Sequence, residues 1–250
     1  MRLTLKAFTG ALALMAVLAA GSASATDALS PAQRKATEEL VRDYILNNPD
    51  VIIQSLRDYE EKQRQTAEKE AEQAIAANRQ ALERDASSPV AGNPNGDVTI
   101  VEFFDYRCGF CKKVLPSVRE LLKTDGKVRW VFKEFPILGP DSGTASQFAL
   151  AAWRTAPEKY LPFHMALMEH RGDLGETQIM EIAKKVGLDV ESLKKARTDP
   201  EIKSTIERNM DLAHTLEVNG TPAFVVGGHL VPGAVDLATL RQLVEEARKG

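Results

Sequence analysis

Hydrophobic and polar positions divide this chain into two parts of different character. Between residues 27 and 86, single apolar residues recur every three or four positions among many charged ones. Beyond residue 97, short unbroken apolar runs alternate with longer amphipathic stretches. The first pattern is typical of helices, and the second is typical of buried strands separated by helices. The sequence therefore predicts an N-terminal helical arm, residues 26–86, followed by an α/β domain, residues 97–250.

Residues that are frequent at the ends of helices mark where the first helix of the arm starts and where it is interrupted. Ser30 suits the N-cap of a helix, with Pro31 at the first helical position and Gln33 at the third. The run Asn47-Asn48-Pro49 ends this helix and starts the next. From Asp50 to Ser88 there is neither Gly nor Pro, so a second, long helix is expected. It carries too few large apolar side chains to fold back into a core, and we expect it to be extended.

One side of the long helix allows two interpretations. Its apolar and small residues follow one another at coiled-coil steps of three or four: Ile52, Leu56, Tyr59, Gln63, Ala67, Ala71, Ala74, Asn78 and Ala81. Because several of them are small or polar, the helix is either a stalk that pairs with other copies or a charged helix surrounded by solvent. The more apolar stretch, residues 40–56, is the better candidate for self-association.

Residues 97–250 predict a split α/β core that is interrupted by helices. A linker rich in Pro, Gly and Asn, residues 87–96, precedes this domain. Strand, helix and strand come first, then a helical insertion at about 140–200, then a hairpin and a closing helix. Strands are expected at 98–104, 128–133, 223–226 and 229–231, and helices at 109–123, 144–154, 157–170, 176–186, 190–197, 201–216 and 236–248.

The first 25 residues have the three parts of a secretory signal. Arg2 and Lys6 give a positive start, residues 11–20 are apolar, and Ala23-Ser24-Ala25 is a small-x-small cleavage site. The apolar run is shorter than the roughly 20 residues that cross a membrane. Cleavage after Ala25 is therefore favoured over a retained anchor. The mature chain is then expected in an oxidising compartment, the periplasm.

Composition and charge argue against a nucleic-acid partner and against a purely structural disulfide. The net charge is −3, charges of both signs are mixed along the chain, and no basic patch indicates a nucleic-acid partner. Hydrophobic residues make up 44% of the chain, which is enough for one sizeable core. The chain has two cysteines, and only two residues separate them. A bridge that closes so small a loop contributes little to stability, so a purely structural disulfide is disfavoured.

These cysteines form the motif Cys108-Gly109-Phe110-Cys111, between a predicted strand and a predicted helix. A helix N-terminus favours anions, so we expect Cys108 to be an accessible thiolate that attacks disulfides. Cys111 lies one turn further along, where we expect it to be deeper, less exposed and able to resolve a mixed disulfide. The four histidines are distant in sequence, so no zinc site is expected. Two soft thiolates alone can still hold Cu(I).

Two further elements are candidates for the site. Glu102 interrupts an apolar strand six residues before Cys108. If it is buried, its pKa is raised and it can exchange protons with Cys111; the alternative is a glutamate exposed at the edge of the sheet. Thr221-Pro222 immediately precedes a predicted strand. With a cis bond, the Thr221 backbone faces outward and can pair with an extended peptide.

The stretch from Phe103 to Lys112 resembles the active site of bacterial DsbA-like proteins of the thioredoxin superfamily. The resemblance extends over residues 97–250 and includes Glu102, Pro116, the helical insertion and Thr221-Pro222. It implies a thioredoxin-like fold with an inserted helical domain. It also implies that the Thr221-Pro222 bond is cis and that this proline packs opposite the disulfide.

The same resemblance implies the roles of the site residues. Cys108 is the attacking thiol, Cys111 the resolving thiol, and Glu102 the proton relay. No cofactor is implied beyond a redox-active disulfide between the two cysteines. The residues expected to contact the substrate are Phe110, Thr221 and Pro222.

The helical arm narrows the resemblance to ScsC proteins, suppressors of copper sensitivity, some of which trimerise through such an arm. In that subgroup oligomers act as disulfide isomerases, whereas forms without the arm behave as monomeric oxidases or carriers of reduced thiols. The strong oxidase of the superfamily carries Pro-His between its cysteines, and this chain carries Gly109-Phe110. The absence of an imidazole predicts a less oxidising couple.

Together these features predict a periplasmic thiol–disulfide interchange enzyme that is more isomerase or reductase than oxidase. Its expected partners are secreted client proteins with disulfides, a membrane-bound thiol reductase that recharges the pair, and other copies of the chain, with a trimer favoured. Three alternatives stay open: a monomeric dithiol oxidase, a Cu(I)-binding protein, and a client-binding chaperone whose cysteines are incidental.

Overall fold

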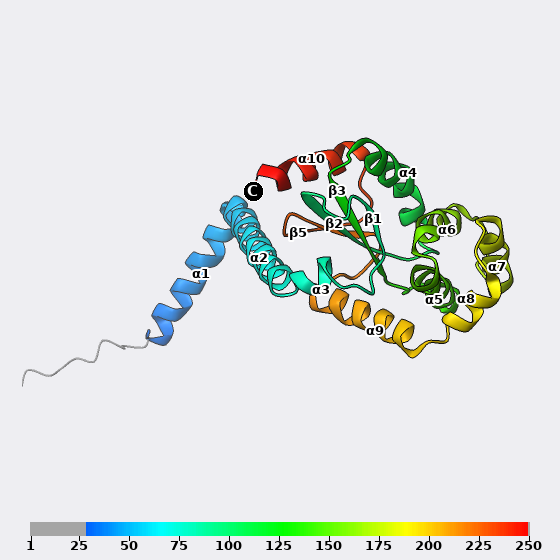
Figure 1. Cartoon of the computed structure of the whole chain (residues 1–250). Helices are drawn as coiled ribbons and strands as arrows, with labels where there is room; N and C mark the ends of the chain where they lie inside the picture. The colour runs from blue at the N-terminus through cyan, green and yellow to red at the C-terminus, as the bar shows by residue number, and fades with distance from the viewer. Residues whose placement is uncertain (1–28, 250) are drawn as a thin grey trace, which may run out of the picture. The chain divides into compact units, whose positions relative to one another are not determined.

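The computed structural model describes residues 29–249, and Figure 1 shows their helices and strands. The expected signal peptide, residues 1–25, lies outside the described residues. The chain divides into two compact units, with the boundary between Glu60 and Glu61. Within the described part of the chain, no helix is both long and apolar enough to cross a membrane.

The first unit consists of helix α1, Pro31–Asn47, and the first part of helix α2, which runs from Pro49 to Ala77. Ser30 caps α1 as predicted: its Oγ accepts from the Gln33 N–H at 3.3 Å, and the Gln33 side chain accepts from the Ser30 N–H at 2.9 Å. All residues from 29 to 60 are exposed in the single chain. The large apolar ones are Leu29, Leu40, Val41, Tyr44, Ile45, Leu46, Val51, Ile52, Ile53, Leu56 and Tyr59.

The long helix ends earlier than the sequence indicated. It stops at Ala77, and after Asn78 a short helix α3, Arg79–Glu83, follows. Ile75 is 5% exposed and Leu82 is 1% exposed, and both join a buried cluster with residues of the sheet. The expectation that this stretch has too little to bury was wrong, because two large apolar side chains hold it against the sheet. This end of the predicted arm belongs to the second unit.

The second unit is built on a five-stranded sheet with the order β1-β3-β2-β4-β5. Strands β2, Val98–Phe104, and β3, Val128–Glu134, pair in parallel at its centre. Strand β4, Ala223–Val226, is antiparallel to β2 and forms a hairpin with β5, His229–Pro232. These four strands lie where the sequence predicted them.

The segment expected to be a linker, residues 87–96, instead contributes the edge strand β1, Val90–Gly92, antiparallel to β3. Gly92 has a φ of +73°, and a Cβ at this position would lie 2.5 Å from the Val128 carbonyl oxygen. A glycine is therefore required for the close approach of the two strands. Gly92, which in the sequence indicated a flexible linker, instead allows strand β1 to form at the edge of the sheet.

Helices cover both faces of the sheet (Figure 1). Helix α4, Gly109–Thr124, and helix α10, Leu237–Lys249, contact each other on one face. Helix α9, Pro200–Thr215, packs on the other face together with α3. The helical insertion between β3 and β4 begins with four helices before α9: α5, Pro140–Thr155; α6, Pro157–Glu169; α7, Glu176–Lys185; and α8, Val190–Ala196.

A buried lysine fixes the segment after α3 to the sheet. Lys133 is 1% exposed, and its Nζ donates to the Ala81 carbonyl and to the Ser88 hydroxyl, at 2.7 Å each. Burial lowers the pKa of Lys133 to about 8, although the nearby Asp85 carboxylate opposes the shift. The polar contacts of Lys133 therefore add to the apolar contacts of Leu82 in holding this segment.

We expect Leu82→Ala to lower the free energy of unfolding by about 3 kcal/mol, because it leaves a cavity at a fully buried site. Gln80→Ala, on the exposed side of the same short helix, is the matched control and should change it by less than about 0.5 kcal/mol. Urea unfolding followed by tryptophan fluorescence measures both, since both tryptophans lie in the second unit. Equally small effects would show that α3 does not belong to the core.

Candidate active site

The two cysteines lie at the junction of strand and helix that the sequence indicated. Cys108 is the N-cap of α4, and Cys111 lies in its first turn. Both are free thiols, and the Cys111 N–H donates to the Cys108 sulfur at 3.3 Å. In its protonated form the Cys108 thiol donates to the carbonyl oxygen of Thr221, 3.1 Å away. Residues 113 positions apart in the sequence therefore meet at one sulfur atom.

The Thr221-Pro222 peptide bond is cis, as the resemblance implied. Pro222 is buried and Thr221 is partly exposed, immediately before the first residue of β4. The Pro222 carbonyl accepts from the Gly233 N–H at 2.8 Å. The structure thus brings this pair to the cysteines, while its role in binding a substrate stays a prediction.

The cysteines are more enclosed than expected. Cys108 is 5% exposed and Cys111 is 2% exposed, so the two thiols differ little in accessibility. The Thr221 carbonyl lies against the Cys108 sulfur and covers it on that side. Phe110, between the cysteines, is 59% exposed, and the Lys113 Nζ lies 4.8 Å from the centroid of its ring. The exposed part of the motif is therefore an aromatic ring beside a cation.

Hydrogen bonds make the two thiols chemically different. The hydrogen bond from the Cys111 side chain lowers the pKa of Cys108 to about 6, against an opposing effect of burial. The Thr221 side chain and the backbone N–H groups of Phe110 and Cys111 add to the lowering. Burial raises the pKa of Cys111, and its hydrogen bond to Cys108 and the nearby Glu102 charge act in the same direction. At neutral pH, Cys108 is mainly a thiolate and Cys111 a thiol.

Glu102 is buried in the centre of the sheet. It is 4% exposed and lies on β2, between β3 and β4, so the alternative of an edge-exposed glutamate is wrong. Burial raises the pKa of Glu102 to about 8; the hydrogen bond from Trp130 lowers it, and the Cys108 charge raises it further. A carboxyl group with this pKa gains and loses a proton near neutral pH, which suits a relay for Cys111.

Trp130 is a site residue that the sequence analysis missed. Its Nε1–H donates to Glu102 Oε2 at 3.0 Å. The pairing of β2 with β3 places Trp130 opposite Ile100, two residues from Glu102 on the same face. A buried tryptophan needs a partner for its indole N–H. That requirement, together with the register of the strands, is the signal that identifies the pair.

Asp105 fixes the turn before Cys108. It is fully buried, and its Oδ1 accepts from the Arg107 N–H at 2.7 Å and from the Ser142 hydroxyl at 2.8 Å. Its Oδ2 accepts from the Leu138 N–H at 2.9 Å, and its carbonyl accepts from the Cys108 N–H at 3.1 Å. One carboxylate therefore ties the loop after β3 to the cysteine motif.

A second buried carboxyl group, Glu134, lies outside the predicted site. Its Oε1 accepts from the hydroxyls of Tyr106 at 3.1 Å and Tyr160 at 3.4 Å, and its Oε2 accepts from Ser146 at 2.8 Å. Burial raises its pKa well above the usual range. The Tyr106 hydroxyl also lies 3.1 Å from Nδ1 of His164, which is a core residue as expected. The cluster joins β3 to α5 and α6 beside the cysteine motif.

Among the described residues, 29–249, no three or more His, Cys, Asp and Glu side chains are grouped so that they could hold a metal ion.

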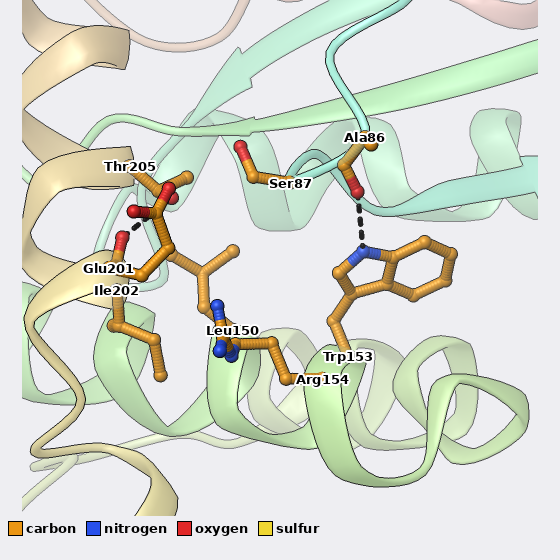
Figure 2. A pocket seen from close by; sticks show the side chains of 8 residues that line it. All are labelled: Ala86, Ser87, Leu150, Trp153, Arg154, Glu201, Ile202 and Thr205. Carbon is orange, nitrogen blue, oxygen red and sulfur yellow. Dashed lines mark hydrogen bonds between the residues drawn. The ribbon is translucent and has the colours of Figure 1, made fainter.

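A cavity of about 330 Å³ lies between α5, α9 and the loop after α3, where the Trp153 indole N–H donates to the Ala86 carbonyl at 3.5 Å (Figure 2). None of the predicted site residues lines it. The lining residues are Ala86, Ser87, Leu150, Trp153, Arg154, Glu201, Ile202 and Thr205.

Comparison with known proteins identifies the family of this chain. Residues 99–245 match the DSBA-like thioredoxin domain, and residues 33–66 match the copper resistance protein ScsC N-terminal domain. The chain belongs to the DsbA-like thioredoxin-domain family. The predicted thioredoxin-like fold with a helical insertion and an N-terminal helical arm is confirmed.

Solved structures of similar proteins support the same assignment. A thioredoxin-like oxidoreductase from Silicibacter pomeroyi is 46% identical and covers 69% of this chain and 99% of its own, with a TM-score of 0.67. ScsC from Proteus mirabilis is 32% identical and covers 88% of this chain and 99% of its own, with a TM-score of 0.67. A periplasmic thioredoxin-like protein from Salmonella enterica serovar Typhimurium is 32% identical over 69% of this chain and 96% of its own, with a TM-score of 0.65.

Two kinds of curated protein, a disulfide bond formation protein and Na⁺/H⁺ antiporters, are similar to this chain. Disulfide bond formation protein D of Bacillus subtilis is 25% identical over 172 residues, 65% of this chain and 78% of that protein. The Na⁺/H⁺ antiporter NhaA 3 of Salinispora tropica is 29% identical over 160 residues, 63% of this chain. The chain spans only 24% of the length of that antiporter.

The raised pKa of Glu102 predicts a pH dependence of stability. The folded pKa of about 8 lies above the ordinary value of 4.5, so between these pH values the folded state holds a proton that the unfolded state has lost. Stability must then fall as pH rises from about 4.5 to about 8. Glu102→Gln removes this fall and should stabilise the protein at pH 7 by on the order of 3 kcal/mol.

Urea unfolding at several pH values between 4 and 9 measures this effect. Glu245→Gln, at an exposed position of α10, is the control and should retain the slope of the wild-type protein. If wild type and Glu102→Gln lose stability in parallel over this range, the pKa of Glu102 is the same in the folded and unfolded states, and the proposed proton exchange with Cys111 near neutral pH is contradicted.

Proposed function

We propose that this chain is a periplasmic thiol–disulfide interchange protein that acts as an isomerase or reductase on secreted client proteins. The asymmetry of the cysteine pair carries the proposal: the pKa of Cys108 is lowered to about 6 and that of Cys111 is raised. Disulfide exchange needs a thiolate that attacks and a second thiol that acts only later. Two of the similar proteins, a thioredoxin-like oxidoreductase and a disulfide bond formation protein, support the same chemistry.

The proposed reaction begins when the Cys108 thiolate attacks a client disulfide. A bond forms between Cys108 and one client sulfur, the client's own S–S bond breaks, and the second client sulfur leaves as a thiolate. In isomerisation, a client thiolate then attacks the mixed disulfide and releases Cys108 unchanged. In reduction, Cys111 gives its proton to the ionised form of Glu102 and attacks Cys108. The client leaves with two reduced sulfurs, which take their protons from water, and the Cys108–Cys111 disulfide remains for a membrane-bound thiol reductase to reduce.

The pKa of Cys108 supports reduction or isomerisation of client disulfides over their oxidation. A value of about 6 lies closer to the value of about 7 for thioredoxin, a reductant, than to about 3.5 for the strong oxidant DsbA. A less stable thiolate makes the reduced form less favoured and the couple less oxidising. The Gly109-Phe110 dipeptide, which offers no imidazole to the thiolate, supports the same direction.

The exposed face of the arm supports self-association. Large apolar side chains cluster between Leu40 and Tyr59, and all are exposed in the single chain. So many exposed large apolar side chains in one helical segment are typical of a protein–protein interface. Several copies, with a trimer favoured, would then present several cysteine sites to one partly folded client. Export is supported by the predicted signal at 1–25 and by the periplasmic relative from Salmonella.

Purified reduced protein should restore activity to scrambled ribonuclease and should show little oxidase activity on a reduced peptide. Cys111→Ser should capture the client as a mixed disulfide, visible on non-reducing gels after acid quenching, because the resolving thiol is absent. Cys108→Ser should capture none. Efficient oxidation of the peptide without unscrambling would instead identify a dithiol oxidase.

Ile52→Arg combined with Leu56→Arg should convert the oligomer to a monomer, because two charges enter the apolar face of α2. Gln65→Arg, at an exposed polar position of the same helix, is the matched control. Sedimentation velocity measures the mass of each variant. The double variant should retain exchange with small disulfides but lose most of its activity on scrambled ribonuclease. A wild-type protein that sediments as a monomer would contradict the proposed oligomer.

Binding of Cu(I) is a second candidate, because residues 33–66 match a copper resistance protein domain. A site of two thiolates requires both sulfurs to be ionised, and the raised pKa of Cys111 adds to the cost of this state. Titration of the reduced protein with Cu(I), followed by an exchange assay, distinguishes the two functions. Stoichiometric binding without any exchange activity would favour copper.

A further inference from the structure

We infer that this site selects polypeptide disulfides that are flanked by carboxylates. The inference rests on the proposed exchange function and adds the chemical class of the preferred client. It follows from the charged side chains nearest to Cys108 in the sequence, which are cationic where they are exposed and acidic only where they are buried.

The sequence around Cys108 places acids and bases at different depths. The two nearest acids, Glu102 and Asp105, are 4% and 0% exposed, and each carboxylate accepts hydrogen bonds from the protein. Neither presents a negative charge to a client at the surface. The bases within five residues of the attacking sulfur are all at least partly exposed: Arg107, Lys112 and Lys113.

Two of these cations are held beside exposed apolar groups. Arg107 Nη1 donates to the Leu138 carbonyl at 2.8 Å, and the Leu138 side chain is 43% exposed. The Lys113 Nζ lies 4.8 Å from the centroid of the Phe110 ring, which is 59% exposed. Each arrangement pairs a positive charge with an apolar surface. A peptide with alternating apolar and acidic side chains matches both features.

Lys112 extends the positive surface toward the end of α6. Its Nζ donates to the His170 carbonyl, and burial together with the charge of Arg171 lowers its pKa, while the Cys108 charge opposes the shift. The Arg171 guanidinium is therefore near enough to add to the field at this side of the site. Two acids lie close in sequence to the residues that Arg107 and Lys112 contact: Asp141, in the first turn of α5, and Asp173, in the loop after α6. The four cations, Arg107, Lys112, Lys113 and Arg171, outnumber them.

This charge distribution favours anionic substrates. The cations attract carboxylates and raise the rate of encounter, and this effect weakens with added salt. A disulfide flanked by lysines is repelled by the same cations and meets Cys108 more slowly. The cations also stabilise the client thiolate that leaves when Cys108 attacks, but this gain is the same whatever residues flank the disulfide.

Three disulfide-linked peptide dimers test the inference. Their chains are acetyl-Glu-Cys-Glu-amide, acetyl-Gln-Cys-Gln-amide and acetyl-Lys-Cys-Lys-amide, and each is mixed with the reduced full-length protein. The measurements are made at pH 8.5, above the Cys108 pKa of about 6, so that differences in ionisation do not contribute. Acid quenching and chromatography give the rate of release of peptide thiol. Each rate is divided by that of a neutral small thiol with the same peptide.

The acidic dimer should react about tenfold faster than the basic dimer at low ionic strength, and the ratio should approach one in 0.5 M NaCl. Arg107→Gln combined with Lys113→Gln should lower the ratio severalfold at low salt. Lys123→Gln, an exposed change at the opposite end of α4, should leave the ratio unaltered. A wild-type ratio near one, or one that neither salt nor the double variant changes, would overturn the inference.

Two further results separate the inference from the function on which it rests. Exchange with all three dimers at equal rates would leave the proposed function intact and contradict only the preference for acidic clients. No exchange with any dimer would contradict the function and the inference together. Glutathione disulfide, also anionic, should react more slowly than the acidic dimer; a faster reaction would assign the cationic surface to a small anionic thiol rather than to a client.

Discussion

The hydrogen bonds that converge on the Cys108 sulfur are the interaction on which this site depends. The first turn of α4 supplies backbone N–H groups, and Cys111 supplies a side-chain donor. Without them the enclosure of the pair would favour two neutral thiols, because burial opposes ionisation of either sulfur. Both cysteines have little solvent exposure, but hydrogen bonds outweigh burial at Cys108, whereas burial is the main effect at Cys111.

The remaining parts of the domain can be understood as supports for that turn. Asp105 holds the backbone that leads into Cys108. The carbonyl of Thr221, two residues before β4, contacts the Cys108 sulfur. Glu102 and Trp130 place a neutral carboxyl group in the sheet. A buried carboxyl that must ionise lowers stability, and its presence in an otherwise apolar strand fits the proposed proton transfer better than a role in packing. At Glu102 the core contains a titratable group that lowers the stability of the fold.

Much of this arrangement could be predicted from the sequence because its signals are local. Four of the five strands and the caps of α1 and α4 follow from short apolar runs and capping residues. The edge strand at Val90–Gly92 was missed because its Gly and Pro surroundings are also typical of linkers. Trp130, Asp105 and Glu134 were missed because their partners are 28 to 37 residues away or on another element. Contacts of this kind depend on strand register and loop placement, which local patterns do not specify.

The rate of Cys108 alkylation by iodoacetamide in the reduced native protein, followed from pH 4 to 10, tests the central claim most directly. The account predicts that one cysteine is modified, that it is Cys108 by peptide mapping, and that its rate follows a single ionisation near pH 6. A midpoint near 8.5, the value of a free cysteine, would show that the helix turn does not stabilise the thiolate. Equal modification of Cys111, or none of either thiol in the folded state, would equally contradict the account.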